Sequence, residues 1–176
     1  MSESLVKWVQ FVSIMLYVLV AGVMWGTWLS LARSMTDYDA ATFLTDGKHM
    51  IENLAVIMAV LMISAVVIGL VAVVLLFRSR STVAAWLAVI GLVLMIAVMV
   101  VTLTVEVPID NLIATWTEAS LPADWQEIRA RWSVFHTVRT FASLGAVAAA
   151  VGAALTIRAT DRELSRPRLE VDHSPL

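Results

Sequence analysis

The chain has 176 residues, of which 60% are hydrophobic and 15% charged, and its mean hydropathy is +0.87. A soluble domain carries about a quarter charged residues, and the formal net charge of -2 gives no basic excess for binding nucleic acid. Cysteine is absent, which excludes disulfides, thiolate nucleophiles, Cys-ligated zinc and iron–sulfur clusters. We therefore expect a polytopic membrane protein with no nucleic-acid partner.

Four long apolar runs divide the chain, and each is long enough to cross a hydrocarbon core about 30 Å thick as a helix. The predicted spans cover about 8–31, 49–77, 82–105 and 133–157. The sequence thus predicts an all-α, integral membrane four-helix bundle, embedded in the lipid bilayer as a single domain over residues 1–157.

Two of the spans carry small residues that would let another helix approach closely. The first span contains Gly22 and Gly26 in a G-x-x-x-G pattern, and the fourth contains Gly145, Ala149 and Gly152. Either face could pack within one subunit or join two copies of the chain. A homo-oligomer through Gly22/Gly26 or through the small-residue face of the fourth helix therefore stays open.

The first polar connection covers residues 33–48. Thr36 and Asp37 are predicted to cap a short interfacial helix that lays Phe43 and Leu44 on the membrane. The second span then begins near residue 49, and its first turns must project from the bilayer or lie inside the bundle because the span is long for one crossing.

Three polar residues stand in those first turns of the second span. His49, Glu52 and Asn53 are spaced i, i+3 and i+4, so they share one face of the helix. We expect this face to contribute to a polar site at the end of the bundle.

The third span is followed directly by Glu106 and then by Pro108, which is predicted to end or kink the helix. A long connection to about Asp124 comes next. Asp124 with Glu127 three residues later indicates a helix start, and this outer helix should continue unbroken into the fourth span. Its early residues Glu127 and Arg129 are predicted to lie on a solvated face.

The distribution of Lys and Arg near the span ends predicts that both termini are cytoplasmic. With this orientation we expect a multi-pass protein of a bacterial-type inner (plasma) membrane. The charged segment 158–176 contains Pro167 and Pro175 and is predicted to be a disordered cytoplasmic tail.

Polar residues from three spans are expected to converge at the outer end of the bundle. On the fourth helix, Trp132, His136 and Arg139 lie at i, i+4 and i+7 and share a stripe. Arg139 is followed by apolar and small residues, and an ionised group at that depth needs a partner. Glu52 and Glu106 are the available carboxylates.

Two interpretations of this cluster involve no acid–base chemistry. The ion pair could simply pin the helices together in a non-enzymatic scaffold, lipid-binding protein or accessory subunit. Alternatively, the cluster could hold a metal, because its side chains are of the types that bind iron, manganese or zinc between bundle helices; copper stays open as well. That metal set is His49, Glu52, Glu106 and His136, although the repeated Glu-x-x-His of di-iron bundles is absent. Haem with His49 and His136 as axial ligands is a less favoured alternative. A small transporter is also less favoured, because no span is interrupted near its middle by Gly or Pro.

A third interpretation is acid–base chemistry on an apolar small molecule. His136 would act as the base, since an unperturbed histidine titrates near neutrality. Arg139 would stabilise a developing oxyanion, and Trp132 and Trp116 would provide aromatic walls.

At these same residues the chain resembles the anthrone oxygenase family of small four-helix membrane proteins. The family pattern is an Asn-Val-Pro-x-Asn segment at the end of the third helix, followed later by Trp-x-x-x-Asn-x-x-Arg. The corresponding segments here are 106–111 and 132–139. Glu106 and His136 depart from the pattern, because Asn is commoner at both positions.

The resemblance implies oxidation of a flat apolar, polyketide- or quinone-like substrate by dioxygen. A base removes the acidic methylene proton of an anthrone, and the delocalised anion reacts directly with oxygen, so no metal or other cofactor is strictly required. The implied catalytic residues are His136 as base, Arg139 as anion stabiliser and Asn111 as hydrogen-bond donor. The substrate-binding residues would be Trp132, Trp116, Asp110 and Asn53.

Overall fold

The computed structural model describes residues 2–164, with side chains through residue 157. Helices and their connections make up this part of the chain, which contains no strand. The long helices and the π-helical segments inside them are α1 (Glu3–Thr27), η1 (Trp28–Ala32), α2 (Ala40–Arg78), α3 (Thr82–Val101), η3 (Thr102–Glu106), α4 (Val107–Thr115) and α5 (Trp125–Leu164). The predicted all-α class is confirmed.

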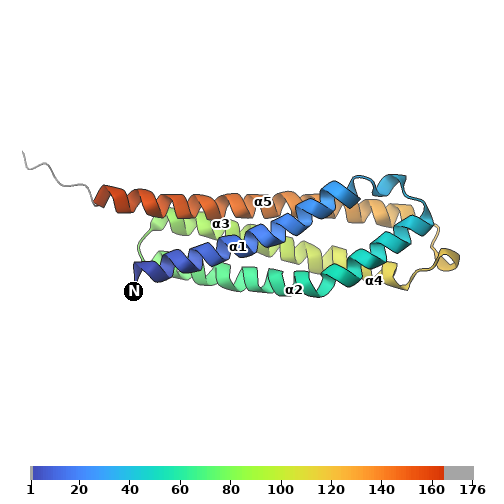
Figure 1. Ribbon diagram of the computed structural model, residues 1–176, viewed down its shortest axis with the longest axis horizontal. Coiled ribbons are helices and arrows are strands. Elements are labelled where there is room, and N and C mark those ends of the chain that lie inside the picture. The colour runs from blue at the N-terminus through green and yellow to red at the C-terminus, as the bar shows by residue number, and fades with distance from the viewer. Residues whose placement is uncertain (1, 165–176) are drawn as a thin grey trace, which may run out of the picture.

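Four of these helical stretches are long and apolar enough to cross a membrane, and the chain is a multi-pass membrane protein. In the bundle, α1 packs against α2 and α5, and α3 packs against the same two helices (Figure 1). The N-terminus, the α2–α3 turn and the end of α5 lie at one end of the bundle. We call the opposite end, which carries the connections 33–39 and 116–124, the distal end.

Small residues bring α3 and α5 together. A Cβ atom on Gly91 would lie 3.1 Å from the main-chain oxygen of Ala146, so the two backbones are nearly in contact. On α5, Gly145 and Gly152 also face side chains of α3. This small-residue face of the fourth helix therefore packs within the subunit.

The glycine pair of α1 is different. A Cβ atom on Gly22 or Gly26 would meet nothing within 4 Å, and both residues are exposed on the outer surface of the bundle. A homo-oligomer through this face stays a prediction.

The start of α2 differs from the expectation of a separate interfacial helix. Asp39 is the N-cap of α2 and accepts a hydrogen bond from the backbone N–H of Thr42 over 2.8 Å, which holds the pKa of Asp39 below its usual range. The helix then continues without interruption to Arg78. Phe43 and Leu44 do not lie on the membrane, because both are buried in a distal apolar cluster with Trp116 and others.

Arg129 was expected on a solvated helix face, and that prediction is wrong. Its side chain is buried, with Nη1 and Nη2 donating to the main-chain oxygens of Tyr38 and Thr36 over 3.1 and 3.2 Å. The guanidinium also lies over the rings of Trp125 and Phe43. Arg129 thus attaches the α1–α2 connection to α5.

Pro108 kinks the third span without ending it. A proline lacks the N–H that would bond the carbonyl of Thr104, and its ring collides with that carbonyl in a regular α-helix. The chain adopts the wider π-helical turn of η3 immediately before it and then continues as α4 to Thr115. The connection to α5 is therefore shorter than predicted.

The fourth span and its outer helix form one continuous helix, α5, as expected. It begins at Trp125 and runs to Leu164, beyond the predicted end near Ile157. The rest of the predicted disordered tail, 165–176, lies outside the described residues.

Candidate functional site

A cavity of about 320 Å³ lies between the helices in the distal half of the bundle, a volume at the lower end of the range for small-molecule sites. Its walls come from α1, α2, α3, η3, α4 and α5 and are mostly apolar. Five of the nine methionines of the chain line it: Met24, Met50, Met58, Met62 and Met99. Thioether side chains are flexible and pack well against aromatic rings.

Polar groups enter this apolar cavity from one side. Asp110 and Asn111 lie on α4, His136 and Arg139 on α5, and Thr102 on η3. The segment η3 contacts both α4 and α5, and it continues directly from α3, which packs along α5. The opposite wall, formed by α2, contributes apolar side chains.

Arg139 is the centre of the polar network. Its Nη2 lies 2.9 Å from Glu106 Oε2, and its Nη1 donates to Thr102 Oγ1 over 3.0 Å. This geometry confirms that Arg139 pairs with a carboxylate, and it selects Glu106. Glu52, the other available acid, is exposed and faces His49 instead.

Glu106 has no exposed surface, and the pair with Arg139 is held by charge alone. The distance between Glu106 Oε2 and Arg139 is that of an ion pair, but among the described residues neither carboxylate oxygen has a partner with hydrogen-bond geometry. Both residues lie within spans, where an unpaired charge would be costly. Neutralising each other is therefore a sufficient reason for the two to be adjacent.

His136 has both ring nitrogens engaged. Nδ1 lies 2.9 Å from Arg139 Nη2, and Nε2 lies 3.3 Å from the main-chain oxygen of Met24. A guanidinium nitrogen only donates and a carbonyl oxygen only accepts. His136 is therefore the neutral ring with its proton on Nε2, and its lone pair is directed at Arg139 and not at the cavity.

Asp110 is the carboxylate that faces the cavity. Its Oδ1 accepts a hydrogen bond from Trp132 Nε1 over 3.1 Å. The Trp132 ring stacks on His136 with a centroid separation of 4.7 Å and an interplanar angle of 6°. Asp110, Trp132, His136 and Arg139 consequently form one connected line of contacts along the wall of the cavity.

The π-helical turn explains how η3 and α4 direct several polar groups to one place. A π turn adds a residue to the helical repeat and rotates every later side chain relative to the earlier ones. Thr102 at its start bonds Arg139, Glu106 at its end pairs with Arg139, and Asp110 one turn later faces the cavity. Such turns are frequent at functional sites.

The cavity brings together most of the residues that the sequence suggested. His136, Arg139 and Asn111 line it, as do Trp132 and Asp110. Trp116 and Asn53, the two other predicted substrate-binding residues, are not among the lining residues. Trp116 is buried in the distal apolar cluster and its main-chain oxygen accepts from Lys48, and Asn53 is exposed on α2.

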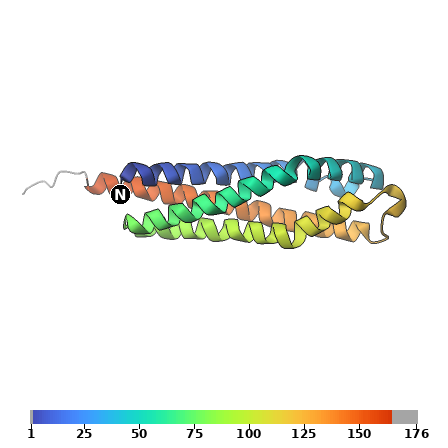
Figure 2. The same ribbon diagram turned by 90° about the horizontal axis from the view of Figure 1, so that it is seen from below.

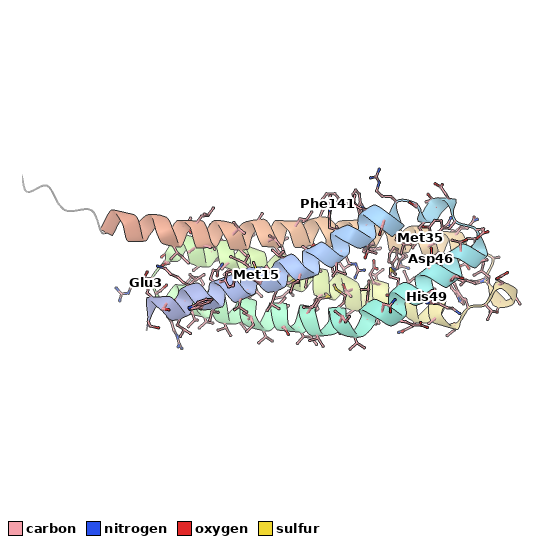
Figure 3. All side chains as sticks on the ribbon, viewed as in Figure 1. Glu3, Met15, Met35, Asp46, His49 and Phe141 are labelled. Atoms are coloured by element: carbon pink, nitrogen blue, oxygen red, sulfur yellow. The ribbon has the colours of Figure 1, made fainter. Side chains whose placement is uncertain are left out.

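The structure does not bring the four predicted metal ligands together. The side chains of His49 and Glu52 are 71% and 73% exposed, whereas Glu106 and His136 are buried. Figure 3 shows His49 and Asp46 on the distal part of α2. Among the residues that the structure describes, no group of three or more His, Asp or Glu side chains is placed to hold a metal ion.

Sequence reasoning missed Thr102 and the methionines. A threonine in a span usually forms a hydrogen bond within its own helix, and Thr102 does donate to the Val98 main-chain oxygen over 2.8 Å. Only the additional hydrogen bond that Thr102 accepts from Arg139 marks it as part of the site. The methionines carried a weak signal, because Met50, Met58 and Met62 recur at helical spacing on one face of α2.

Comparison with known proteins places the chain in a family. The family model for anthrone oxygenase matches residues 48–149, and no curated protein or solved structure matches the chain. The matched region contains every cavity-lining residue except the three that come from α1. Because it covers more than half of the sequence, the chain belongs to the anthrone oxygenase family.

Proposed function

We propose that this protein oxidises a flat apolar ketone or phenol of the anthrone type with dioxygen, inside the distal cavity. Family membership supports an oxygenase-like function. The observation that carries the proposal further is that a carboxylate, Asp110, and a cation, Arg139, line the same mostly apolar cavity. Polyketide- and quinone-like molecules have the flat aromatic body and the few oxygens that such a cavity would accept.

The reaction balances with dioxygen as the only co-reactant. A base takes one proton from the methylene carbon, and the resulting anion is delocalised as a phenolate. The anion passes an electron to dioxygen, and the two radicals join to form a carbon–oxygen bond and, after protonation, a hydroperoxide. Loss of the second methylene hydrogen as a proton breaks the O–O bond, leaving the quinone carbonyl and releasing water.

Asp110 is the proton acceptor that the geometry supports best. Its Oδ1 is held by Trp132, and the carboxylate lies at the cavity surface. His136, the base expected from the sequence, directs its lone pair at Arg139 and its N–H at Met24. We therefore assign the proton transfer to Asp110 and treat His136 as a positioning residue.

Arg139 and Asn111 would bind the oxygen that gains charge. An anthrone anion carries its charge on the ketone oxygen, and a preorganised cation or amide donor stabilises such an oxyanion in a water-poor site. Arg139 is fixed by Thr102, His136 and Glu106, so little reorganisation is needed when the anion forms.

A non-enzymatic scaffold is the alternative, and one observation favours it. The buried Glu106–Arg139 pair joins η3 to α5 and would serve as a helix clamp without any substrate. The scaffold does not require Asp110 at the cavity surface, so variants of Asp110 separate the two proposals.

The test is oxygen uptake with anthrone by the purified protein in lipid nanodiscs, with empty nanodiscs measuring spontaneous oxidation. Asp110→Asn should lower the rate about 100-fold or more, the usual contribution of general base catalysis. Asp46→Asn, an exposed carboxylate of the same helical bundle, is the matched control and should keep the parent rate.

A second measurement isolates the proton step. Under anaerobic conditions in D₂O, the parent protein should speed the exchange of the methylene hydrogens of anthrone, and Asp110→Asn should not. A parent protein that neither consumes oxygen nor catalyses exchange above empty nanodiscs would favour the scaffold.

A further inference from the structure

The distal cavity reaches the outer surface of the bundle between two helices. Six of its lining residues are exposed: Ala55, Ala59 and Ile63 on α2, and Leu103, Val107 and Asn111 on η3 and α4. Each set recurs every four residues and so forms a stripe along its own helix. The two stripes border one opening, which we call the lateral window.

The lateral window is closed at both of its ends. On the distal side, Lys48 Nζ donates to the Trp116 main-chain oxygen over 2.7 Å. On the other side, Met62 of α2 packs in one cluster with Met95 and Val98 of α3. Between these contacts α2 runs obliquely across the bundle (Figure 2), and Ala55 and Ala59, which line the cavity and are exposed, have small side chains.

The position of the window along α2 indicates what lies outside it. His49 and Glu52 have more than 70% of their side chains exposed, and charged groups avoid exposure to hydrocarbon, so these residues mark the level of the membrane surface. Ala55, Ala59 and Ile63 follow towards the centre of the span. Ile63 lies about 16 Å farther along the axis of α2 than Glu52, at a rise of 1.5 Å per residue.

The residues around the lateral window change from aliphatic at its deep end to polar at its distal end. Ile63 and Leu103 at the deep end have 57% and 60% of their surface exposed and are aliphatic, as suits contact with acyl chains. Asn111 at the distal end offers an amide at the interfacial level. A molecule with an apolar ring system and an oxygen at one edge matches both ends of this rim.

We propose that the lateral window admits the ligand of the cavity directly from the bilayer, and that this ligand is a flat, uncharged aromatic molecule dissolved in the distal leaflet. The ligand's identity as a substrate rests on the proposed function, whereas the route does not. Beyond the window, Met50, Met58 and Met24 would receive the ring, since sulfur packs favourably at the edges of aromatic rings.

The absence of cysteine allows a test that needs no catalysis. Met24 is buried on α1 and lines the cavity, so a thiol at that position would be reached only through the cavity. Met24→Cys protein in nanodiscs would be treated with N-phenylmaleimide, a flat apolar thiol reagent, or with the charged 2-(trimethylammonium)ethyl methanethiosulfonate. Labelling would be followed by mass spectrometry.

The proposal expects N-phenylmaleimide to label Met24→Cys and the charged reagent not to. Adding Ala59→Phe at the window should slow labelling at least tenfold. Ala148→Phe, at an exposed alanine of α5 outside the cavity lining, is the matched control and should not slow it. Thermal unfolding checks that both variants fold, and labelling after denaturation checks that the thiol is reduced.

Three outcomes would overturn the proposal. They are an unchanged labelling rate with Ala59→Phe, labelling of the folded protein by the charged reagent, and no labelling of the folded protein by N-phenylmaleimide. Failure of the proposed function would look different, because labelling through the window would persist while anthrone oxidation was absent.

Discussion

Arg139 and Glu106 form an ion pair across the α5–η3 contact, with 2.9 Å between Nη2 and Oε2, at a place where Glu106 has no exposed surface. Each charge lowers the cost of burying the other. Breaking a buried pair by removing one partner costs about 3–5 kcal/mol, whereas replacing both charges together is often nearly neutral.

This relationship predicts a strong coupling between the two positions. Glu106→Gln should lower the free energy of unfolding by about 3–5 kcal/mol because Arg139 loses its ion-pair partner. The double variant Glu106→Gln/Arg139→Met should recover most of the loss. Reversible unfolding in detergent with increasing SDS would measure both, and additive effects of the two substitutions would contradict the coupling.

His136 should behave as a positioning residue. In His136→Gln an amide oxygen is available to accept from Arg139, so oxidation of anthrone should stay within about tenfold of the parent, which is less than the usual contribution of a general base. His136→Leu removes the acceptor and should reduce the rate more. Equal losses in both variants, together with loss of anaerobic exchange, would instead make His136 the base.

The two exposed residues His49 and Glu52 should not affect the reaction. Their side chains face each other at 3.8 Å on the outside of α2, away from the buried Glu106 and His136. His49→Ala and Glu52→Gln should each keep the parent rate of oxygen uptake and the parent metal content by elemental analysis. A metal lost in both His49→Ala and His136→Ala would show that these residues share a ligand set after all.

Two glycines should respond in opposite directions to the same substitution. A Cβ atom on Gly69 would collide with the hydroxyl of the buried Tyr17, and overpacking of this kind costs about 1–3 kcal/mol. Gly22→Ala meets nothing within 4 Å and removes a residue of low helix propensity, so it should be neutral or slightly stabilising.

Unfolding of Gly69→Ala and Gly22→Ala under identical conditions would compare them. A destabilised Gly22→Ala protein would indicate that a second copy of the chain packs on the α1 face. Cross-linking of the parent protein and of Gly22→Leu in membranes would then test that dimer directly.

The sequence predicts the bundle well because apolar length fixes the spans and helical periodicity fixes the stripe of Trp132, His136 and Arg139. Arg139 lies among apolar residues of a span, so the sequence also predicts that it pairs with a carboxylate. In the structure that carboxylate is Glu106. These features depend on the spacing of residues along the chain or on the cost of burying a charge in a membrane, and both can be evaluated from a single sequence.

The rotation of α2 could not be predicted in the same way. His49, Glu52 and Asn53 do share a face, but that face is exposed, since close packing of Gly47 near Ile113 and of Gly69 near Tyr17 sets the orientation of the helix. Exposing a polar side chain at the membrane surface has no free-energy cost, so these residues can face outward. With 39 residues, or about 58 Å at 1.5 Å per residue, α2 extends well beyond the hydrocarbon.

The contacts of the two ring nitrogens of His136 could not be predicted from the sequence either. Residue type suggested a base, whereas the contacts with Arg139 and the Met24 carbonyl depend on how α1 and α5 cross. The effect of Pro108 was ambiguous for a similar reason, because a π-helical turn and a helix end are both solutions to the same missing N–H.

Under the proposed function, the methionine wall has a consequence for the lifetime of the protein. A hydroperoxide that escapes its normal breakdown, or peroxide released from it, would meet thioethers on several sides of the cavity, and thioethers oxidise to polar sulfoxides. Each such oxidation would make the apolar wall of the cavity more polar and lower its affinity for the next aromatic molecule. The same residues that suit the cavity to aromatic molecules would then limit the number of turnovers, and sulfoxide at the lining methionines should increase as the proposed reaction proceeds.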